Sequence, residues 1–575
     1  MSFNILLEKL KEQNRPAEDL ELIKKAYDFA ARAHEGQKRK SGEPFINHPL
    51  STAVKLTEMR LDSKTIAAAL LHDTIEDHPE FETELKKIFG EEIAFLVDGV
   101  TKLNKIKYKG SQRTAESLRK MFLAIGEDIR IVLLKLVDRT HNMETLQYLP
   151  ADKQKRIATE TLEIYAPLAY RLGMKKLSGQ LEDLAFPYVL PERYEWLSKI
   201  TSDKFPEWTK YMEKIKPVLI MELARDEVKF ASITSRIKHL YSLYKKLLKY
   251  DLDISKITDI VALRVIVYTL EDCYAALGVV HKLWRPVPGK IRDYIALPKP
   301  NGYKSLHTTV FGPEDNMFEV QIRTVEMHQE AEYGIAAHWA YTEFKKERPK
   351  DYAERQASFL NQKRFAWLDQ IREWQKDVES PDEFLEALKI DFFKARIFVL
   401  SPKGDVIDLP EGATPIDFAY HIHTDLGSSA TGSKVNGKMV SLDHQLKTGD
   451  VVEILIQKGK KPSIDWLKFV KSTQARKKIS SVLKKLTESK KFEKKGGEMV
   501  EIRLPAKDRF GLLHDVTYVF TKQKINMKNV TTDNKSKSYP AIIIQTVLKN
   551  RGELEKIMVR LKEVKGVMEV SYKLL

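Results

Sequence analysis

The stretch "LLHDTIED", residues 70–77, decides how the first third of this chain folds. It places His72, Asp73, Glu76 and Asp77 directly after the apolar run "IAAALL". Ionisable groups beside a buried segment are unfavourable unless a partner compensates them. On a helix, His72 and Glu76 share one face, and Asp73 and Asp77 share the adjacent face. The stretch therefore predicts a helix whose polar side meets a metal ion, a substrate or solvent.

Two more polar clusters flank this stretch along the chain. The upstream cluster "RKSGEPFINHP" contains His48, and in the downstream cluster "LVDRTHNMETL" Asp138, Asn142 and Thr145 follow i, i+4, i+7 spacing. These clusters lie in regions where apolar residues recur every three or four positions, which is typical of helices. Helix caps and surface carboxylates are the alternative interpretation of the same residues.

A mixed nitrogen and oxygen set can be assembled from these clusters, comprising His48, His72, Asp73 and Asp138. Two imidazoles with carboxylates and no thiolate suit Mn²⁺, Fe²⁺ or Zn²⁺ in an open catalytic site. Such a cation lowers the pKa of a water molecule. Glu76 and Asp77, a turn further on, could orient that water.

Composition narrows the function classes. The 575 residues are enough for roughly three to five domains, and the single cysteine, Cys273, excludes a disulfide framework and a multi-cysteine zinc site. No signal-peptide pattern and no apolar run of about 20 residues is found, so we expect a cytoplasmic protein that does not enter a membrane. The formal charge of +16 favours polyanionic partners such as nucleotides or RNA.

Much of this charge falls in residues 458–498, which hold 13 Lys and one Arg against four acidic residues. A solvated helix and linker is one interpretation. An RNA-contacting helix around "DWLKFVKSTQARKKI" is the other.

The hydrophobic pattern divides the rest of the chain. Residues 1–190 are expected to be almost wholly helical, with a helical connector to about 225. "DIVALRVIVY" and "MFEVQIRT" then predict strands, "EDCYAALGVVHKLW" predicts an amphipathic helix, and the Pro- and Gly-rich residues 285–312 predict a loop. Short strands with turn signals occupy residues 394–457, and residues 499–575 follow a βαββαβ, ferredoxin-like order.

A second set of charged residues accompanies the predicted strands. The strand period of two puts Glu319, Gln321 and Arg323 on one face of "MFEVQIRT", and Asp259 begins the neighbouring strand. Asp259 and Glu319 together could hold Mg²⁺ between donor phosphates and an attacking hydroxyl, and Tyr303 could stack on a purine. The candidate cations for a triphosphate are Arg236, Lys238, Lys246, Arg264, Lys290, Arg292, Lys299 and Lys304.

Several long motifs resemble the RelA/SpoT homologues, bacterial enzymes of the stringent-response alarmone (p)ppGpp. "HEGQKRKSGEPFINHP", "LLHDTIED", "VDRTHNM" and "IYAPLAYRLG" are similar to their HD hydrolase domain. "DIVALRVIV", "GKIRDYIALPKPNGYKSLHTT", "EVQIRT" and "EMHQEAEYGIAAHW" resemble the synthetase domain. "AYHIHTDLG" and "KVNGKMVSLDHQLKTGDVVEI" resemble the TGS module, and the βαββαβ segment resembles the ACT module.

The resemblance implies a multidomain fold: an all-α HD domain, an α+β synthetase like the palm of polymerase-β-type nucleotidyltransferases, a β-grasp TGS module and a ferredoxin-like ACT module. The expected boundaries are 1–195 for the hydrolase, 196–345 for the synthetase with its helical connector, 346–390 for a helical linker, 391–457 for TGS, 458–498 for a basic helical connector and 499–575 for ACT.

For the hydrolase, the resemblance implies Mn²⁺ on His48, His72, Asp73 and Asp138. Glu76 and Asp77 would activate water for release of the 3′-pyrophosphate. The residues expected to surround the guanosine nucleotide are Arg39, Lys40, Ser41, Asn142 and Thr145.

For the synthetase, the resemblance implies ATP as pyrophosphate donor and GDP or GTP as acceptor. Asp259 would bind Mg²⁺, and Glu319 would help deprotonate the 3′-hydroxyl. Tyr303 would stack on the acceptor guanine and Arg236 would lie near the adenine. His307, Gln321 and Asn301 would complete the pocket.

One landmark favours two working sites, because "KIRD", residues 290–293, is the basic motif of bifunctional members. Ser235 stands where the family usually has glycine, and Glu144 where it usually has arginine, which reverses a charge near the hydrolase nucleotide. A single-activity enzyme and a non-catalytic RNA- or ribosome-binding scaffold are the alternatives. We also expect reciprocal control of the two reactions.

The C-terminal half departs from full-length relatives. Only about 40 residues separate TGS from ACT, and no cysteines are available for the cysteine-rich module usual between them. In relatives TGS contacts the 3′ end of uncharged tRNA, and His421 and His423 occupy the matching motif, although packing or turn roles are the plainer interpretation. ACT modules bind small ligands or form homodimers, and Gly511 starts the corresponding helix. "GSKVNGKM", residues 432–439, nearly matches a P-loop but has Met439 in place of Ser or Thr and lacks the strand-to-helix context.

Overall fold

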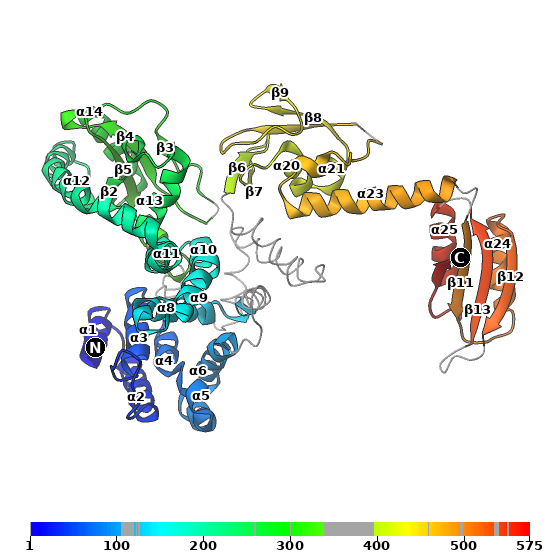
Figure 1. Ribbon diagram of the computed structural model, residues 1–575, viewed down its shortest axis with the longest axis horizontal. Coiled ribbons are helices and arrows are strands. Elements are labelled where there is room, and N and C mark those ends of the chain that lie inside the picture. The colour runs from blue at the N-terminus through cyan, green and yellow to red at the C-terminus, as the bar shows by residue number, and fades with distance from the viewer. Residues whose placement is uncertain are drawn as a thin grey trace. The chain divides into compact units, whose positions relative to one another are not determined.

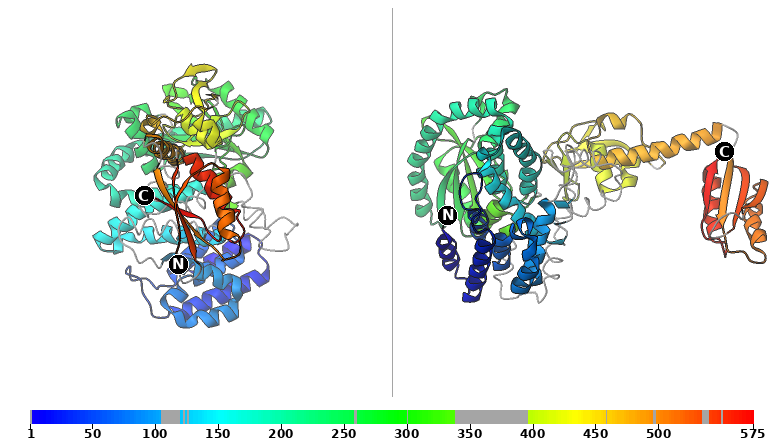
Figure 2. Two further views of the ribbon diagram at one scale, coloured as in Figure 1. Left: turned by 90° about the vertical axis from the view of Figure 1, so that its right-hand side faces the viewer. Right: turned by 60° about the horizontal axis from the view of Figure 1, so that its bottom comes forward.

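The computed structural model (Figures 1 and 2) divides into two compact units, Met1–Lys389 and Ile390–Leu575. It describes residues 2–104, 120–121, 124, 127–257, 260–299, 301–337, 396–457, 459–494, 498–533, 540–548 and 551–575. The predicted linker at 346–390 lies outside these residues. Within them, no helix is both long and apolar enough to cross a membrane.

The first part of unit 1 is helical, as predicted. Its helices are α1 (Phe3–Glu12), α2 (Ala17–Ala33), α3 (Asn47–Glu58), α4 (Ser63–Leu71), α5 (Thr74–Asp77), α6 (Glu82–Asn104), α8 (Ile129–Glu144), α9 (Ala151–Glu160), α10 (Ala166–Arg171) and α11 (Lys175–Val189). The apolar helix α4 lies at the centre, where it contacts α2, α3, α6 and α8. Each residue of α4 except Lys64 is buried. Burial of α4 on every side explains its almost uninterrupted apolar sequence.

The expected continuous helix through "LLHDTIED" is wrong in one detail. Helix α4 ends at Leu71, and α5 begins at Thr74, so His72 and Asp73 lie in the turn between two helices. The His72 ring Nδ1 lies 2.8 Å from the carbonyl oxygen of Ala69, which is one of the last carbonyls of α4. A side-chain donor thus satisfies a carbonyl that the end of the helix leaves without an intrahelical partner.

The second part of unit 1 is an α/β region built on a five-stranded sheet. Its strands are β1 (Phe230–Ile237), β2 (Val261–Val267), β3 (Arg292–Asp293), β4 (Leu306–Phe311) and β5 (Met317–Thr324), in the order β1-β2-β5-β4-β3. Strands β2 and β5 pair in parallel, and the other pairs are antiparallel. The long helix α12 (Pro191–Arg225) lies along β1 and β2 (Figure 1), with α13 (Leu240–Leu247), α14 (Leu270–Leu283) and α15 (Val325–Tyr333) completing the region.

The strand predictions for β2 and β5 are confirmed, as is the amphipathic helix α14, where Cys273 and Val280 are buried in the core. The prediction of a loop over the whole of 285–312 is wrong. Its last residues form β4, which pairs with β5 from Leu306 to Phe311. The pairing brings β-branched side chains at Thr308, Thr309 and Val310 into a buried strand, a preference hidden by the surrounding Pro and Gly residues.

Unit 2 begins with a small module of short strands. It contains β6 (Arg396–Leu400), β7 (Val406–Pro410), β8 (Ala430–Val435), β9 (Lys438–Val440) and β10 (Val452–Ile456), with helices α20 (Pro415–Ile422) and α21 (Thr424–Ser428). The near-P-loop "GSKVNGKM" is the β8–β9 hairpin. Its turn residues Asn436 and Gly437 have φ of 52° and 79°, as a two-residue hairpin turn requires.

The basic segment after β10 starts as part of this module's core. It forms α22 (Trp466–Phe469) and α23 (Thr473–Lys494), and Trp466, Val470 and Ile479 are buried against α20. The fully buried Asp417 carboxylate on α20 accepts hydrogen bonds from the backbone amides of Lys471 and Ser472. The segment is therefore not a fully solvated connector at its start.

The C-terminal module confirms the βαββαβ prediction. It comprises β11 (Glu498–Pro505), α24 (Leu512–Lys522), β12 (Met527–Asp533), β13 (Ala541–Leu548), α25 (Arg551–Lys562) and β14 (Ser571–Leu574). The strand order is β12-β13-β11-β14. Apolar residues of the sheet and both helices, including Ile502, Phe520, Ile544 and Leu561, form its core.

Two candidate active sites

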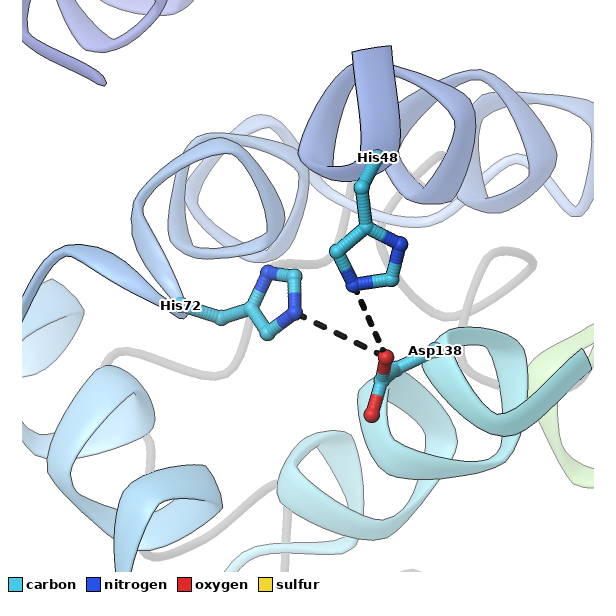
Figure 3. Close-up of side chains that lie close together, drawn as sticks. All are labelled: His48, His72 and Asp138. Carbon is cyan, nitrogen blue, oxygen red and sulfur yellow. Dashed lines mark ion pairs between the residues drawn. The ribbon is translucent and has the colours of Figure 1, made fainter. Parts of the chain in front are cut away.

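The helical region brings three predicted ligands together (Figure 3). His48 of α3, His72 after α4 and Asp138 of α8 are buried, and one potential ligand atom of each lies within 4.8 Å of the others. The Asp138 Oδ1 atom lies 3.0 Å from His48 Nε2 and 3.8 Å from His72 Nε2. Three separate helical elements thus supply two imidazole nitrogens and a carboxylate oxygen that converge on one point.

Asp73, the fourth predicted ligand, faces both histidines. Its two carboxylate oxygens lie 3.4 Å from His48 Nε2 and 3.3 Å from His72 Nε2. Asp77 lies nearby at the surface, where partial desolvation together with the negative charge of Asp73 raises its pKa. Glu76 is half-buried on α5. Asp73 therefore lies beside both histidines, and Asp77 is close enough to Asp73 for its charge to be felt.

The cluster fits a divalent cation. Because the Nδ1–H of His72 donates to Ala69, the Nε2 atom points toward Asp138, and this buried nitrogen has no hydrogen-bond partner among the described residues. Burial disfavours a charged His72, yet Asp73 and Asp138 outweigh it and raise its pKa to about 9. Burial also opposes ionisation of Asp138, but Lys135 and the two histidines hold its pKa well below the ordinary value. The carboxylates that favour a proton on His72 would equally favour a metal cation.

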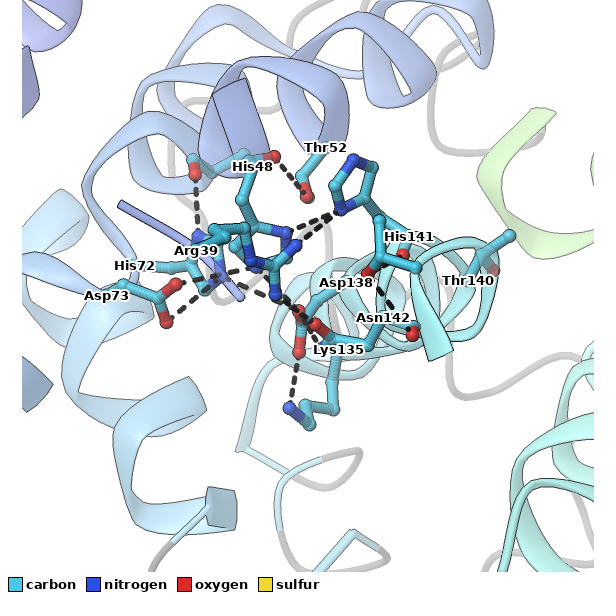
Figure 4. Close-up of polar contacts among 12 residues, drawn as sticks. Arg39, His48, Thr52, His72, Asp73, Lys135, Asp138, Thr140, His141 and Asn142 are labelled. Carbon is cyan, nitrogen blue, oxygen red and sulfur yellow. Dashed lines mark hydrogen bonds and ion pairs between the residues drawn. The ribbon is translucent and has the colours of Figure 1, made fainter. Parts of the chain in front are cut away.

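A polar network surrounds the cluster (Figure 4). Arg39 donates from Nη2 to Asn142 Oδ1 at 2.7 Å and from Nη1 to His141 Nδ1 at 3.0 Å. Asn142 donates to Asp138 Oδ1 at 2.7 Å, and Lys135 donates to Asp138 Oδ2. Asn142, a predicted nucleotide contact, therefore bonds directly to a candidate metal ligand, and Arg39, another, reaches the ligands through Asn142 and His141.

The other predicted nucleotide contacts are less tied to the cluster. Lys40 is exposed, and Ser41 has a buried hydroxyl with no hydrogen-bond partner among the described residues. Thr145 donates to the carbonyl of His141 on its own helix at 3.2 Å. Glu144, expected to reverse a charge here, is paired with Lys55 at 2.6 Å, so the reversal is locally balanced.

The second candidate site lies on β4 and β5. The Tyr303 hydroxyl donates to His307 Nε2 at 2.7 Å, and His307 Nδ1–H donates to Glu319 Oε1 at 2.7 Å. Gln321 donates to the other Glu319 oxygen at 2.8 Å. Burial lowers the pKa of His307 and raises that of Tyr303, so both are neutral hydrogen-bonding groups near pH 7. Glu319 is thereby held as an acceptor between two donors.

An arginine cluster lies beside this relay. Arg264 on β2 and Arg323 on β5 both pair with Glu332 of α15, at 3.2 and 3.1 Å. The charge of Arg236 on β1 acts on the same groups, since it contributes to the pKa of both arginines. Within the part of the chain that the structure describes, three guanidinium groups thus gather around the Glu332 carboxylate, an excess of positive charge suited to phosphate.

The remaining predicted synthetase residues differ in position. Lys299 is close enough to Glu319 and Lys238 for both to affect its pKa, which burial lowers, and Lys304 lies 3.8 Å from Glu330. Lys246 is half-buried on α13, and Lys290 and Arg292 are exposed. Asp259 lies outside the described residues, although β2, which starts two residues later, does neighbour β5 as predicted.

Helix α11 connects the two candidate sites. Its first residue, Lys175, places Nζ 3.0 Å from the centroid of the Tyr303 ring. Just before this helix, the side chain of Asn301 donates to the carbonyl oxygen of Tyr170 at 3.5 Å. The backbone amide of Ile335 donates to the carbonyl oxygen of Leu172 at 2.9 Å. Burial, and then the cations Lys299, Arg236 and Arg323, lower the pKa of Lys175 well below its usual range.

The sequence predictions did not include His141, Lys135 or Lys175. His141 could have been found, because it follows Asp138 by three positions on the same helix face. Lys135 precedes Asp138 by three positions and could have been found in the same way. No sequence signal marks Lys175, whose neighbour Tyr303 is far away in the chain.

Four family models match the chain: HD domain at residues 26–175, Region found in RelA / SpoT proteins at 235–346, TGS domain at 397–456 and ACT domain at 497–571. Guanosine-3′,5′-bis(diphosphate) 3′-pyrophosphohydrolase of Aquifex aeolicus is 46% identical over 86% of this chain and 68% of that protein. The chain belongs to the RelA/SpoT family. Its RelA/SpoT region contains the Tyr303–His307–Glu319 relay, and its HD domain contains the histidine cluster.

Another RelA/SpoT relative, named GTP pyrophosphokinase, comes from Myxococcus xanthus. It is 48% identical over 84% of this chain, and the chain spans 63% of its length, which is less than two thirds. Among solved structures, small alarmone synthetase 2 of Bacillus subtilis is 25% identical, covering 32% of this chain and 100% of its own, with a TM-score of 0.21.

Proposed function

We propose that this chain both makes and degrades (p)ppGpp. One site would transfer pyrophosphate from ATP to the 3′-hydroxyl of GDP or GTP, and the other would hydrolyse the 3′-pyrophosphate. The observation that carries the proposal is the presence of two separately built charge clusters, His48–His72–Asp138 and Tyr303–His307–Glu319, in one RelA/SpoT chain. A single-activity enzyme would need only one of them intact.

In the hydrolase, His48, His72, Asp138 and Asp73 would hold Mn²⁺. The cation would supply positive charge against a phosphate oxygen and lower the pKa of a water molecule. Asp77, whose raised pKa reflects burial and Asp73, would exchange a proton with that water, and Glu76 would orient it. Arg39 and Asn142 would bind the guanosine nucleotide, with Lys40, Ser41 and Thr145 around it.

In the synthetase, Glu319 would accept the proton of the acceptor 3′-hydroxyl. Its orientation by His307 and Gln321 supports this role, because a general base must be fixed at hydrogen-bonding distance. Asp259 with Glu319 would hold Mg²⁺. Arg236, Arg264 and the neighbouring lysines would neutralise the triphosphate of ATP, which is the main requirement of phosphoryl transfer. Tyr303 would stack on the guanine.

The two reactions would be controlled reciprocally. Lys175 occupies the neighbourhood of the Tyr303 ring that the guanine would need, so a shift of α11 would be required for acceptor binding. The same helix contacts α8, which supplies Asp138. A movement of α11 could therefore open one site while disturbing the other.

The C-terminal modules would add regulation in the cytoplasm. Basic residues of α23 and the TGS module would contact tRNA or the ribosome, and the ACT module would bind a small ligand or form a homodimer. His423 caps α21 by accepting from the amide of Asp425 at 3.2 Å, and burial lowers the pKa of His421. His423 thus has a structural role of its own.

A nucleotide turnover assay with varied metal tests the proposal. The purified chain should form guanosine 3′-diphosphate species from ATP plus GDP or GTP with Mg²⁺, and should release pyrophosphate from them with Mn²⁺. Turnover in one direction alone would establish the single-activity alternative. Metal-replete protein that binds RNA but neither synthesises nor hydrolyses (p)ppGpp would establish the alternative of a non-catalytic RNA-binding scaffold.

A further inference from the structure

Three side chains meet at the Nδ1 atom of His141. His48 Nδ1 lies 2.8 Å from it, and Arg39 Nη1 lies 3.0 Å from it. His141 comes from α8 and is half-buried between α3 and the Arg39 segment. The His141 ring therefore contacts both His48, a candidate metal ligand, and Arg39, a residue expected to bind the nucleotide (Figure 4).

The hydrogen bond from Arg39 decides which ring nitrogens of His141 and His48 carry a proton. A guanidinium group can only donate hydrogen bonds, so His141 Nδ1 must be an unprotonated acceptor. The proton between the two histidines then sits on His48 Nδ1. With its proton on Nδ1, neutral His48 presents the Nε2 lone pair toward Asp138 and Asp73. His72 likewise directs its Nε2 atom toward these carboxylates, because its Nδ1–H donates to Ala69.

We propose that His141 is a positioning residue of the hydrolase site, which fixes the metal-binding tautomer of His48 and ties it to Arg39. This inference rests on the proposed function. Metal-bound histidines usually donate their second ring N–H to a carboxylate, a carbonyl or water, and losing such a partner weakens metal binding about 10- to 100-fold. A neutral imidazole takes that place here. Because Arg39 shares the acceptor, nucleotide binding and metal binding are linked through one atom.

Two variants of equal size test this role. In His141→Asn the side-chain oxygen occupies nearly the position of Nδ1 and can accept from His48 and Arg39, whereas His141→Leu has the same shape without an acceptor. Mn²⁺ binding to the full chain is titrated without nucleotide, and the sites abolished by Asp138→Asn define the hydrolase metal. Both variants are checked by circular dichroism for native helix content.

We expect His141→Leu to bind Mn²⁺ about 10- to 100-fold more weakly than the native chain and His141→Asn to stay within about threefold. His281→Leu, which removes a histidine bonded to Thr308 in the other region, should bind normally. Equal affinity of His141→Leu and the native chain, or equal weakness of both His141 variants, would overturn the inference. If the native chain binds Mn²⁺ as expected but does not hydrolyse (p)ppGpp, the proposed function fails and this role of His141 stands.

Discussion

Lys175 Nζ lies over the ring of Tyr303, 3.0 Å from its centroid. The ring is buried, and the lysine begins the helix that joins the HD domain to the RelA/SpoT region. A purine that stacks on this face of Tyr303 must displace the amino group. In this conformation the protein itself occupies part of the proposed acceptor site.

Replacing Lys175 by alanine should favour synthesis. Without the competing amino group, the KM for GDP or GTP should fall about two- to fivefold, consistent with the strength of an N–H···π contact. Hydrolysis should keep its KM, since Lys175 touches none of the described hydrolase residues. The matched control is Lys176→Ala, which removes a neighbouring lysine that lies 5.9 Å from a different ring, Tyr333. An unchanged or higher acceptor KM in Lys175→Ala would reject the competition.

The pairing of Lys55 with Glu144 should support the hydrolase. In Lys55→Met, the Glu144 carboxylate is left without its partner two residues after Asn142, and repulsion should raise the KM for (p)ppGpp about two- to fivefold. The double variant Lys55→Met/Glu144→Gln should return to within about twofold of the native KM. Failure of the second substitution to restore the KM would show that Lys55 acts on the nucleotide rather than on Glu144.

Glu332 should stabilise the RelA/SpoT region in a pH-dependent way. Burial opposes its ionisation, but Arg264 and Arg323 outweigh burial and lower its pKa. A lowered folded pKa gives stability that is complete above the unfolded pKa of about 4.3 and is lost as the pH falls below that value. Glu332→Gln, which leaves two arginines uncompensated, should cost about 3 kcal/mol at pH 7 and much less at pH 3. Thermal unfolding followed by near-ultraviolet circular dichroism measures both, and an equal loss at the two pH values would contradict the ion pairing.

Cys273 should be inert in the folded protein. Cys273 lies on α14 and is fully buried in the core of the α/β region. Burial raises the pKa of its thiol to about 12. At pH 8 the thiolate fraction is then on the order of 10⁻⁴, and only the thiolate reacts. Iodoacetamide should modify one thiol per chain in denaturant and almost none in buffer. Rapid stoichiometric labelling of the native chain would contradict the packing of this core.

Local patterns were enough to predict most of the fold. Helices of the first 225 residues, strands β2 and β5 and the βαββαβ order all follow from apolar periodicity, which reports burial directly. Strand β4 was missed because the Pro and Gly residues around it hid the β-branched run that pairs with β5 in a hairpin. The break at His72 and Asp73 was missed because those residues are compatible with a helix.

The candidate site residues could be predicted where ionisable side chains lie next to apolar segments in the sequence. His48, His72 and Asp138 were found because ionisable side chains next to buried segments are unfavourable unless a partner compensates them. The role of His141 emerged only from the structure, in which the Arg39 guanidinium and the His48 ring both contact its Nδ1 atom. The position of Lys175 depends on how α11 packs, which no local pattern encodes.

Separating the two activities by mutation tests the central claim most directly. Asp73→Ala and Glu319→Gln are each assayed for (p)ppGpp synthesis from ATP plus GDP and for (p)ppGpp hydrolysis with Mn²⁺. We predict that Glu319→Gln loses synthesis by about 100-fold or more and keeps hydrolysis within about twofold, and that Asp73→Ala does the reverse. Loss of both activities in either variant, with the fold intact, would contradict two independent active sites.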